Sequence, residues 1–401
     1  MALTIRTLAD DDYPVFGRVL EGAFLSDPDD SDHELERPLF DMGRVHGMFD
    51  GTEMVGAAAV IGREMTVPGG PVPVAAITSV GVKPGHRRRG VLTGLMRAQL
   101  HGLHDGGREA FAALWSSEAT IYGRFGYGPA ARFTDLHLPT GAASHPGVDV
   151  GADRVREVPA EEAMPFVRAL YARVAPTRTG YLSRTDAEWA HHLADGEKHR
   201  GGLTRYRYAL HPNGYAVYRV RHARSDRGAA HELNVREITA ADDVAFAALY
   251  RHLLDVDLAV ELRYFTGSGD PVLHLLADQR LAGRATRDSL WVRLVDLDRA
   301  LVQRDYASDV DVVLDVADDL CPWNAGRWRF TATSGGATVR RVADEADVAL
   351  DIAALGAAFL GGTRLTALAA AQHVRERTPG AVRALSHAFL GDVEPHCPEV
   401  F

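Results

Sequence analysis

Three consecutive arginines and a glycine occupy positions 87–90 of a chain whose formal net charge is −10. A run of strand character precedes them at 75–82, and apolar residues recur at helical spacing from 91 to 103. The first N–H groups of a helix have no internal partners, and the helix dipole adds positive charge there. Arginine side chains, and a glycine that permits close approach, strengthen this preference for anions. The pattern therefore predicts a strand-to-helix turn that binds a pyrophosphate, with a solvated basic turn as the alternative.

The composition limits the class of protein and of ligand. A chain of 401 residues is expected to form two or three domains, and 46% hydrophobic with 24% charged residues is typical of soluble globular proteins. No apolar run is long enough to span a membrane, and the N-terminus does not resemble a signal peptide. Cys321 and Cys397 are too few for a disulfide framework or a metal site, which predicts a cytoplasmic protein without a metal. The excess of acid argues against nucleic-acid binding and favours a cationic substrate.

An acidic segment follows the first predicted helix, whose apolar face lies within residues 15–24. Most of its carboxylates are expected to belong to a solvated loop. One or two of them can face a cleft and attract a polycation, and Asp27 is our first choice as the substrate-binding residue. The acids are Asp27, Asp29, Asp30, Asp32, Glu34 and Glu36.

Strand and helix patterns divide the chain into three predicted domains, at 1–150, 151–287 and 288–401. In the first, extended runs at 54–61 and 72–82 flank a Pro-Gly-Gly-Pro turn and predict a hairpin. A strand at 133–138 is expected to close this unit. The second region repeats the order more weakly and has no arginine turn, and the third, from its strand at 290–297 onward, mixes strands with helical segments. The alternation predicts an α+β (mixed α/β) fold.

The arginine turn resembles a known coenzyme A motif. The GNAT acetyltransferase superfamily uses Q/R-x-x-G-x-G/A, and here Leu92 stands at the last position. That departure matches a subgroup in which RRRG precedes an apolar pair, the enhanced intracellular survival (Eis) family of aminoglycoside N-acetyltransferases. Further segments are similar to that family in the same order along the chain. They are IYGRFGYG, GYLSRTDAEW, GYAVYRV, DPVLHLLAD, LWVRLVDL and the terminal phenylalanine.

The resemblance implies an architecture, a co-substrate and an assembly. The family combines an N-terminal GNAT domain, a degenerate second GNAT-like domain and a C-terminal domain like sterol carrier protein. Its members use acetyl-CoA, act on amino groups of aminoglycosides and related polyamines, and form homohexamers. For this chain these properties are expectations.

The same resemblance places the coenzyme contacts on three segments. Backbone groups at the end of a strand would pair with the pantetheine arm like an added strand. N–H groups at the helix start would hold the pyrophosphate, and the end of the next strand would supply further contacts. For the last segment an ordinary helix N-cap is the alternative. The residues are Val80, Gly81 and Val82; Arg88, Arg89, Gly90, Val91, Leu92 and Thr93; and Ser117 and Glu118.

Tyr122 is the candidate general acid implied by the resemblance. A phenol has a pKa of about 10, so it is protonated at neutral pH and can donate a proton to a departing thiolate. The residues alone allow a different interpretation, because Tyr122, Phe125 and Tyr127 together resemble ordinary core packing. Within the family motif we expect Tyr122 to be catalytic and Tyr127 to be structural.

The general base implied by the family is the C-terminal carboxylate, here that of Phe401. A free α-carboxyl group has a pKa of about 3.3–3.7, and burial between domains would raise it. The apolar end Val400-Phe401, without a charged low-complexity tail, independently predicts that the terminus is docked. A purely structural tail is the alternative.

Four functions can be compared on this basis. The first is acetyl-CoA-dependent acetylation of aminoglycosides and related polyamines. The second keeps the chemistry but uses lysine side chains of proteins as acceptors. The third is a non-catalytic protein that binds a lipid or coenzyme A, which the arginine turn, Tyr122 and the terminal phenylalanine argue against. The fourth, nucleic-acid binding, is disfavoured by the net charge and by the lack of interleaved aromatic residues.

Overall fold

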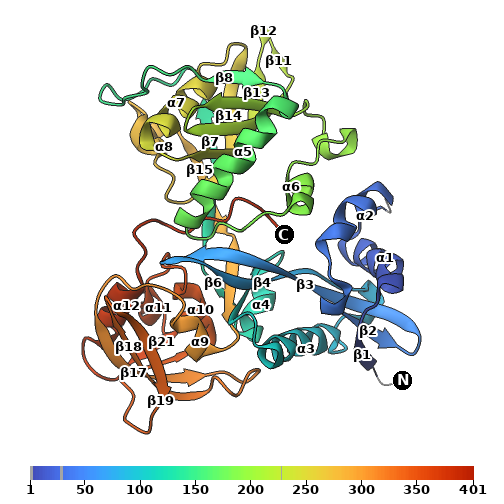
Figure 1. Cartoon of the computed structure of the whole chain (residues 1–401), viewed down its shortest axis with the longest axis vertical. Helices are drawn as coiled ribbons and strands as arrows, with labels where there is room; N and C mark the ends of the chain where they lie inside the picture. Colours follow the sequence, from blue (N-terminus) through green and yellow to red (C-terminus); the bar gives the residue numbers. More distant parts are fainter. Residues whose placement is uncertain (1–2, 28–29, 227) are drawn as a thin grey trace.

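The protein is described by a computed structural model that covers residues 3–27, 30–226 and 228–401. Three main sheets, of seven, seven and five strands, carry the helices, and a small hairpin of β11 (Arg224–Ser225) and β12 (Gly228–Ala229) stands apart (Figure 1). This confirms the mixed α/β class. In the described part of the chain, no helix is long and apolar enough to cross a membrane.

The first sheet has the strand order β1-β2-β3-β4-β5-β16-β6 and carries the arginine turn. Its long hairpin confirms the one predicted at 54–82, and the tip needs glycine because Gly69 and Gly70 have φ of +107° and +142°. Helices α1 and α3 pack on β3. The strands are β1 (Leu3–Thr7), β2 (Val45–Asp50), β3 (Glu53–Val67), β4 (Gly70–Val82), β5 (Phe111–Trp115), β16 (Leu290–Leu294) and β6 (Gly128–Pro129), and the helices are α1 (Tyr13–Phe24), α2 (Asp30–Glu36), α3 (Val91–Gly106) and α4 (Ala119–Tyr122).

The second sheet has the order β15-β7-β14-β13-β10-β9-β8 and is covered by α5 and α7 (Figure 1). Its central strand, β13, carries Glu237, which takes part in a buried bidentate ion pair and a polar network described below. The strands are β7 (Arg132–Pro139), β8 (Arg156–Val158), β9 (Arg207–His211), β10 (Gly214–Arg221), β13 (His231–Ala240), β14 (Ala259–Gly267) and β15 (Gly283–Asp288), and the helices are α5 (Ala160–Val174), α6 (Asp186–His192), α7 (Asp243–Leu254) and α8 (Val272–Leu275).

Two strands lie in different sheets from those expected. The strand at 133–138 forms as β7 but pairs with β14 and β15 of the second sheet. Conversely, β16, expected in the third region, inserts between β5 and β6 of the first sheet. The expectation that 133–138 closes the first unit is therefore wrong. Alternating polarity determines which face of a strand is buried, and it does not determine which sheet the strand joins.

The third sheet, β19-β18-β17-β20-β21, is joined to the first through α10. A Cβ atom on Gly128 would lie 2.0 Å from the carbonyl oxygen of Ala353, and one on Gly356 would lie 2.2 Å from that of Val292. These glycines allow one apolar core to continue across both sheets. The strands are β17 (Val310–Ala317), β18 (Gly326–Thr333), β19 (Gly336–Arg341), β20 (Val348–Asp351) and β21 (Val374–Glu376), and the helices are α9 (Leu297–Leu301), α10 (Ile352–Ala358), α11 (Leu365–Ala370) and α12 (Ala381–Phe389).

Residues 390–401 follow α12 and run back across the junction of the three sheets to end beside α6 (Figure 1). The N–H of Gly391 donates to the oxygen of Gly361 at 3.3 Å, and that of His396 donates to Thr179 at 2.9 Å. Gly180, with φ of +94°, passes so close that a Cβ there would lie 2.6 Å from the oxygen of His396. The C-terminal tail, residues 390–401, is therefore part of the folded molecule.

Candidate active site

The site begins where strands β4 and β5 separate. Among the described residues these parallel strands pair at Ala75 with Ala112 and at Ala76 with Ala113, and the ladder stops there. On its other side β4 continues to pair with β3 as far as Val82. The edge of β4 that faces β5 therefore has unpaired backbone groups beyond Ala76, and these can receive an extended ligand as an additional strand.

A β-bulge directs the end of β4 at this opening. Its register with β3 shifts between Ala57 and Ala59, and the non-glycine Ser79 adopts a φ of +51°. Beyond the bulge Val80 is half-buried, and it packs against the same apolar cluster as Tyr122. Gly81 is buried against α1, where a Cβ would lie 2.9 Å from Ala23. The backbone of the three predicted residues, 80–82, therefore lines the gap between β4 and β5.

The arginine turn lies at the N-terminus of α3 as predicted. Gly90 is the N-cap residue with φ of +82°, no side chain caps the helix, and the space around it is open. Arg88 also has a left-handed φ, of +61°, which is uncommon for a non-glycine residue. Arg89 is held by Asp50, with Nη1 and Oδ2 2.8 Å apart. The free N–H groups of the first turn, at residues 91–93, have the geometry of an anion site.

The next predicted segment lies at the end of β5. Ser117 and Glu118 are exposed, and Glu118 occupies the N-cap position of α4 without a side-chain capping hydrogen bond. The helix-cap alternative therefore has no support from these contacts. Two residues just before this segment also lie at the end of β5 and were not predicted there, because a single polar or aromatic residue at a strand end forms no motif. They are Trp115, which packs against the main core, and Ser116, whose hydroxyl is buried without a partner in the described structure.

Tyr122 ends the short helix α4 and is buried, 6% exposed, in the cluster that also contacts Val80 and Leu92. Burial raises its pKa, and the negative charge of Glu118 raises it further, so the phenol is protonated at neutral pH. Tyr127 packs edge-to-face on it, with centroids 6.0 Å apart. The Tyr127 hydroxyl is fully buried and has no hydrogen-bond partner in the described structure. The structure therefore brings Tyr122, β4 and the start of α3 together.

The C-terminal tail approaches the same end of β5. The thiol of Cys397 is buried beside the indole of Trp115 and donates a hydrogen bond to the oxygen of Glu399 at 3.1 Å. Phe401 is half-buried and packs against the main core, the apolar core that continues across the first and third sheets. Trp115 packs against the same core, whereas Val400 is 60% exposed. The terminus is docked through Cys397, Glu399 and Phe401. The prediction from the sequence that the terminus is docked agrees with these contacts.

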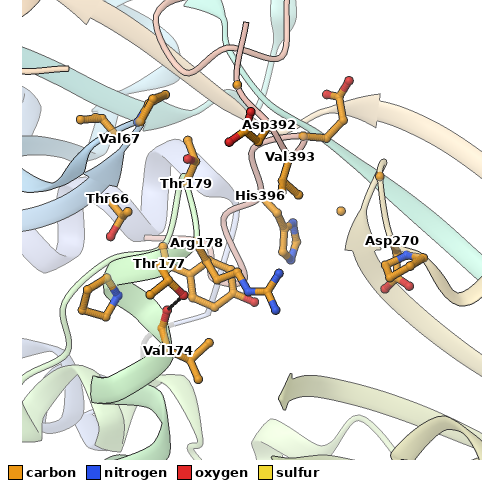
Figure 2. Close-up of a pocket in the computed structure, with 18 of the residues that line it drawn as sticks. Thr66, Val67, Val174, Thr177, Arg178, Thr179, Asp270, Asp392, Val393 and His396 are labelled. Carbon is orange, nitrogen blue, oxygen red and sulfur yellow. Dashed lines mark hydrogen bonds between the residues drawn. The ribbon is translucent and has the colours of Figure 1, made fainter. Parts of the chain in front are cut away.

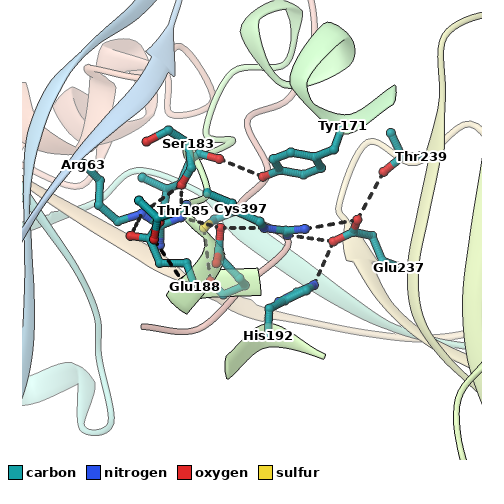
Figure 3. Close-up of polar contacts among 12 residues, drawn as sticks. Arg63, Tyr171, Ser183, Thr185, Glu188, His192, Glu237, Thr239 and Cys397 are labelled. Carbon is teal, nitrogen blue, oxygen red and sulfur yellow. Dashed lines mark hydrogen bonds and ion pairs between the residues drawn. The ribbon is translucent and has the colours of Figure 1, made fainter. Parts of the chain in front are cut away.

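A buried polar network fixes the end of the tail (Figure 3). Glu399 accepts from Arg63 of β3 and from Arg184 of the segment before α6. Arg184 forms a bidentate pair with Glu237 and stacks on Tyr171, 3.9 Å from the ring centroid. Burial alone would raise the pKa of Glu237, but the charge of Arg184 and the hydrogen bonds from His192 and Arg184 together outweigh it and hold that pKa well below the ordinary value. These partners lie far apart in the sequence, so no local pattern could have revealed them.

His192 completes this network as a neutral imidazole. An arginine can only donate, so Nδ1 accepts from Nη2 of Arg236 at 2.7 Å and Nε2–H donates to Glu237 at 2.9 Å. Burial, together with the charge of Arg184, lowers the pKa of His192 to about 4. Arg63 and Arg184 thus share three glutamate partners, at 188, 237 and 399, whereas Arg236 contacts His192.

A cavity of about 520 Å³ borders the tail before it reaches Glu399 (Figure 2). It lies between the tip of the β3–β4 hairpin, the ends of β13 and β14, and tail residues 390–396. His396 lines it, and both ring nitrogens are buried without a partner in the described structure. Burial lowers the pKa of this imidazole to about 4. Since Tyr122, the arginine turn and Phe401 are not among its described lining residues, this cavity is separate from the predicted site.

The acidic segment is only partly placed. Asp27 is exposed in the loop after α1. Asp29 lies outside the described residues, as do the side chains of Asp30 and Asp32. Helix α2, which carries the rest of the segment, packs against α6. The segment therefore lies on the side of the molecule where the tail ends, but no contact of Asp27 tests its predicted role.

The three regions match known families. An acetyltransferase (GNAT) domain matches residues 4–130, a second one matches 180–294, and a sterol carrier protein domain matches 297–398. The first match covers most strands of the first sheet, and the second covers β9, β10, β13, β14 and β15 of the second sheet together with β16 of the first. Members of this acetyltransferase class use acetyl-CoA. In the described residues no cluster of three or more potential metal ligands occurs.

Individual relatives are similar to this chain over most or all of its length. An uncharacterised N-acetyltransferase of Streptomyces avermitilis is 39% identical over 412 aligned residues, covering 100% of both chains. N-acetyltransferase Eis of Mycobacterium tuberculosis is 36% identical over 356 residues, 86% of each chain. The crystal structure of Eis1 from Mycobacterium abscessus has a TM-score of 0.87 and 34% identity, covering 99% of this chain and 100% of that one. The chain is thus an N-acetyltransferase that belongs to the Eis family of the GNAT superfamily.

Proposed function

We propose that this enzyme transfers the acetyl group of acetyl-CoA to amino groups of aminoglycosides and related polyamines. The observation that carries the proposal is the docked C-terminal tail, which is held by buried ion pairs and brought to the end of β5. Two buried arginines, Arg63 and Arg184, hold the tail at this point, which supports a role of the terminus in the site.

Acetyl-CoA binding is supported by the gap between β4 and β5 and by the uncapped start of α3. The pantetheine arm would pair with residues 80–82, and the pyrophosphate would accept hydrogen bonds from residues 90–93. Arg88 and Arg89 would add charge, and Ser117 and Glu118 would contact the coenzyme from the opposite strand end. The gap exposes backbone groups, the turn offers an open anion site, and both fit an extended ligand with a pyrophosphate.

The proposed reaction is a direct transfer that needs one acid and one base. The terminal carboxylate of Phe401 accepts a proton from the substrate ammonium, which leaves a neutral amine. The amine nitrogen attacks the thioester carbonyl carbon, a C–N bond forms, and the C–S bond breaks. Tyr122 donates its proton to the departing sulfur, which yields the free thiol. The acylated nitrogen gives up its second proton, which restores the Tyr122 phenol, and the terminal carboxyl group releases the first proton to water. The raised pKa of Tyr122 supports this role, since the phenol stays protonated until the thiolate develops.

A polycationic amine is supported by the charge of the chain and by its acidic segment. The net charge of −10 favours cations over anions at long range. Asp27, exposed on the loop before α2, is the proposed first contact for an ammonium group. By resemblance to the family we also propose that the enzyme is a homohexamer and that it is located in the cytoplasm. Sedimentation analysis of the purified enzyme would test the oligomeric state.

The first experiment compares the intact enzyme with a variant that lacks Phe401. Thiol release from acetyl-CoA is measured with kanamycin, with a polyamine and with a lysine-containing peptide as acceptors. We expect turnover with kanamycin by the intact chain, and a loss of at least about 100-fold in the variant because the base is displaced. Coenzyme binding and thermal unfolding serve as controls. Full activity without Phe401 would contradict the base, and turnover of the peptide alone would make lysine side chains the acceptor.

A further inference from the structure

Glu399 joins the C-terminal tail to two arginines that lie far apart in the sequence. Its Oε1 lies 3.0 Å from Nη2 of Arg63, on β3 of the first sheet, and 3.3 Å from Nε of Arg184, in the segment before α6. The three side chains are 6%, 2% and 0% exposed, respectively. A carboxylate that bridges two buried guanidinium groups has little freedom, so residue 399 is a fixed point of the tail.

The chain beyond this fixed point is short. Only Val400 and Phe401 follow, and two extended residues span about 7 Å. Val400 faces solvent, while the ring of Phe401 packs against the main core. The position of Glu399 therefore confines the terminal carboxylate to a small volume beside the end of β5.

Glu399 also adds negative charge near the terminus. Arg63 has a second partner in Glu188, with Nε and Oε1 2.9 Å apart, and Arg184 has one in Glu237. His192 is neutral, and the Cys397 thiol adds a hydrogen bond to the backbone of residue 399. Without Glu399 each of the two arginines would keep one glutamate partner. The tail would lose its anchor, and the terminal carboxylate would lose a negative neighbour two residues away.

We propose that Glu399 is a positioning residue for acetyl transfer, which anchors the last two residues on Arg63 and Arg184 and adds negative charge nearby, so that the terminal carboxylate remains an effective base. The inference rests on the proposed function of Phe401. Burial alone would raise the pKa of Glu399, but the charges of Arg184 and Arg63 outweigh it and lower that pKa below the ordinary value. Glu399 is therefore ionised at neutral pH, and its carboxylate is occupied by the two arginines, which makes it an anchor and not the base.

The test uses the full-length enzyme with two substitutions and a matched control. Glu399→Gln keeps the size of the side chain and removes its charge, and Glu399→Asp keeps the charge and shortens the reach. Glu394→Gln is the control, because Glu394 is an exposed acid of the same tail. Each variant is assayed with acetyl-CoA and kanamycin across pH. In a parallel assay without substrate, carboxypeptidase A digests each protein and mass spectrometry follows the release of Phe401.

For Glu399→Gln we expect kcat to fall about 10- to 100-fold, with little change in the KM for acetyl-CoA. The loss of a nearby negative charge lowers the pKa of the terminal carboxylate, so the acid limb of kcat/KM moves to lower pH. Phe401 is released faster, because its anchor is lost. Glu399→Asp loses kcat without moving the acid limb, and Glu394→Gln matches the parent enzyme. Unchanged kcat and release in both Glu399 variants would overturn the inference, as would a loss that only parallels global unfolding.

The variant without Phe401 separates this inference from the proposed function. Faster release of Phe401 from Glu399→Gln, combined with full activity of the truncated enzyme, would contradict the base while leaving Glu399 as the anchor of the tail. An unchanged release rate, combined with an inactive truncated enzyme, would contradict the role of Glu399 while supporting the base.

Discussion

At the scale of single residues, two neighbouring tyrosines have different environments. Tyr122 ends α4 and contacts the cluster that lines the gap between β4 and β5, whereas Tyr127 is enclosed and its hydroxyl has no partner in the described structure. Both phenols have raised pKa values because both are buried. The pKa alone therefore does not identify the acid, and their positions in the fold do.

Replacing Tyr122 with Phe should lower kcat about 100-fold, because the departing thiolate loses its proton donor. The KM for acetyl-CoA should change little, since the ring remains in the cluster. Steady-state kinetics with kanamycin would measure both. Tyr127→Phe is the matched control: it removes a buried hydroxyl without a partner, so activity should persist and the free energy of unfolding should stay equal or rise by about 1 kcal/mol. A greater loss of kcat in Tyr127→Phe than in Tyr122→Phe would reverse the assignment.

The sequence was informative about residues only where they form a local motif. The arginine turn, Tyr122 and Phe401 belong to motifs or to the chain end. The anchor of the tail was not predictable, because Arg63 and Glu399 are separated by 336 positions and neither belongs to a motif. The two side chains meet only because the fold brings the C-terminal tail to β3.

At the scale of elements, the start of α3 depends on a conformation that glycine provides. Gly90 is the N-cap residue at a left-handed φ of +82°, and nothing lies near the position of a Cβ atom. A side chain there would meet no obstacle, so its cost would come from the backbone alone. The helix itself is predictable from its apolar spacing, and its N-cap is predictable because a glycine follows the arginines.

Gly90→Ala should destabilise the turn by about 1 kcal/mol and raise the KM for acetyl-CoA several-fold, because the first-turn N–H groups shift. Gly102→Ala is the control within the same helix: it is exposed, has open space and lacks a positive φ, so it should stabilise the fold by about 1 kcal/mol without changing the KM. Chemical denaturation and coenzyme titration would measure both. An unchanged KM in Gly90→Ala would argue that the turn does not hold the coenzyme.

The sequence patterns predicted where strands form, but they did not predict which strands pair with one another in a sheet. The hairpin of β3 and β4 was predictable because a Pro-Gly-Gly-Pro turn joins its strands. The exchange of β7 and β16 was not, because only two residues, Ala130 and Ala131, separate β6 from β7 and no sequence signal shows that the chain changes sheets there.

At the scale of the whole molecule, the two seven-stranded sheets are interlocked. The domain ranges 1–150, 151–287 and 288–401 remain a proposal, and the exchange gives a way to test them. The segment around Gly151 is exposed and lies outside the strands and helices, so a protease site can be introduced there.

After cleavage at such a site, we expect the two pieces to remain together as an active complex, because each seven-stranded sheet contains strands from both. Size-exclusion chromatography and thiol release would measure association and activity before and after cleavage. The uncleaved protein with the same insertion is the control. Separation of the pieces into independently folded, soluble halves would contradict an interlocked architecture.

The exchange of strands also sets an order of events during synthesis. The first sheet cannot be completed when its own helices have emerged from the ribosome, because β16 lies between β5 and β6 and residues 130–289 must be made first. At about 5–20 residues per second this takes roughly 10–30 s. During that interval the inner edge of β5 has exposed backbone groups, a state prone to wrong pairing with other chains. The nascent enzyme is thus most vulnerable to aggregation midway through translation, and slow expression or a chaperone that protects this edge should raise its yield.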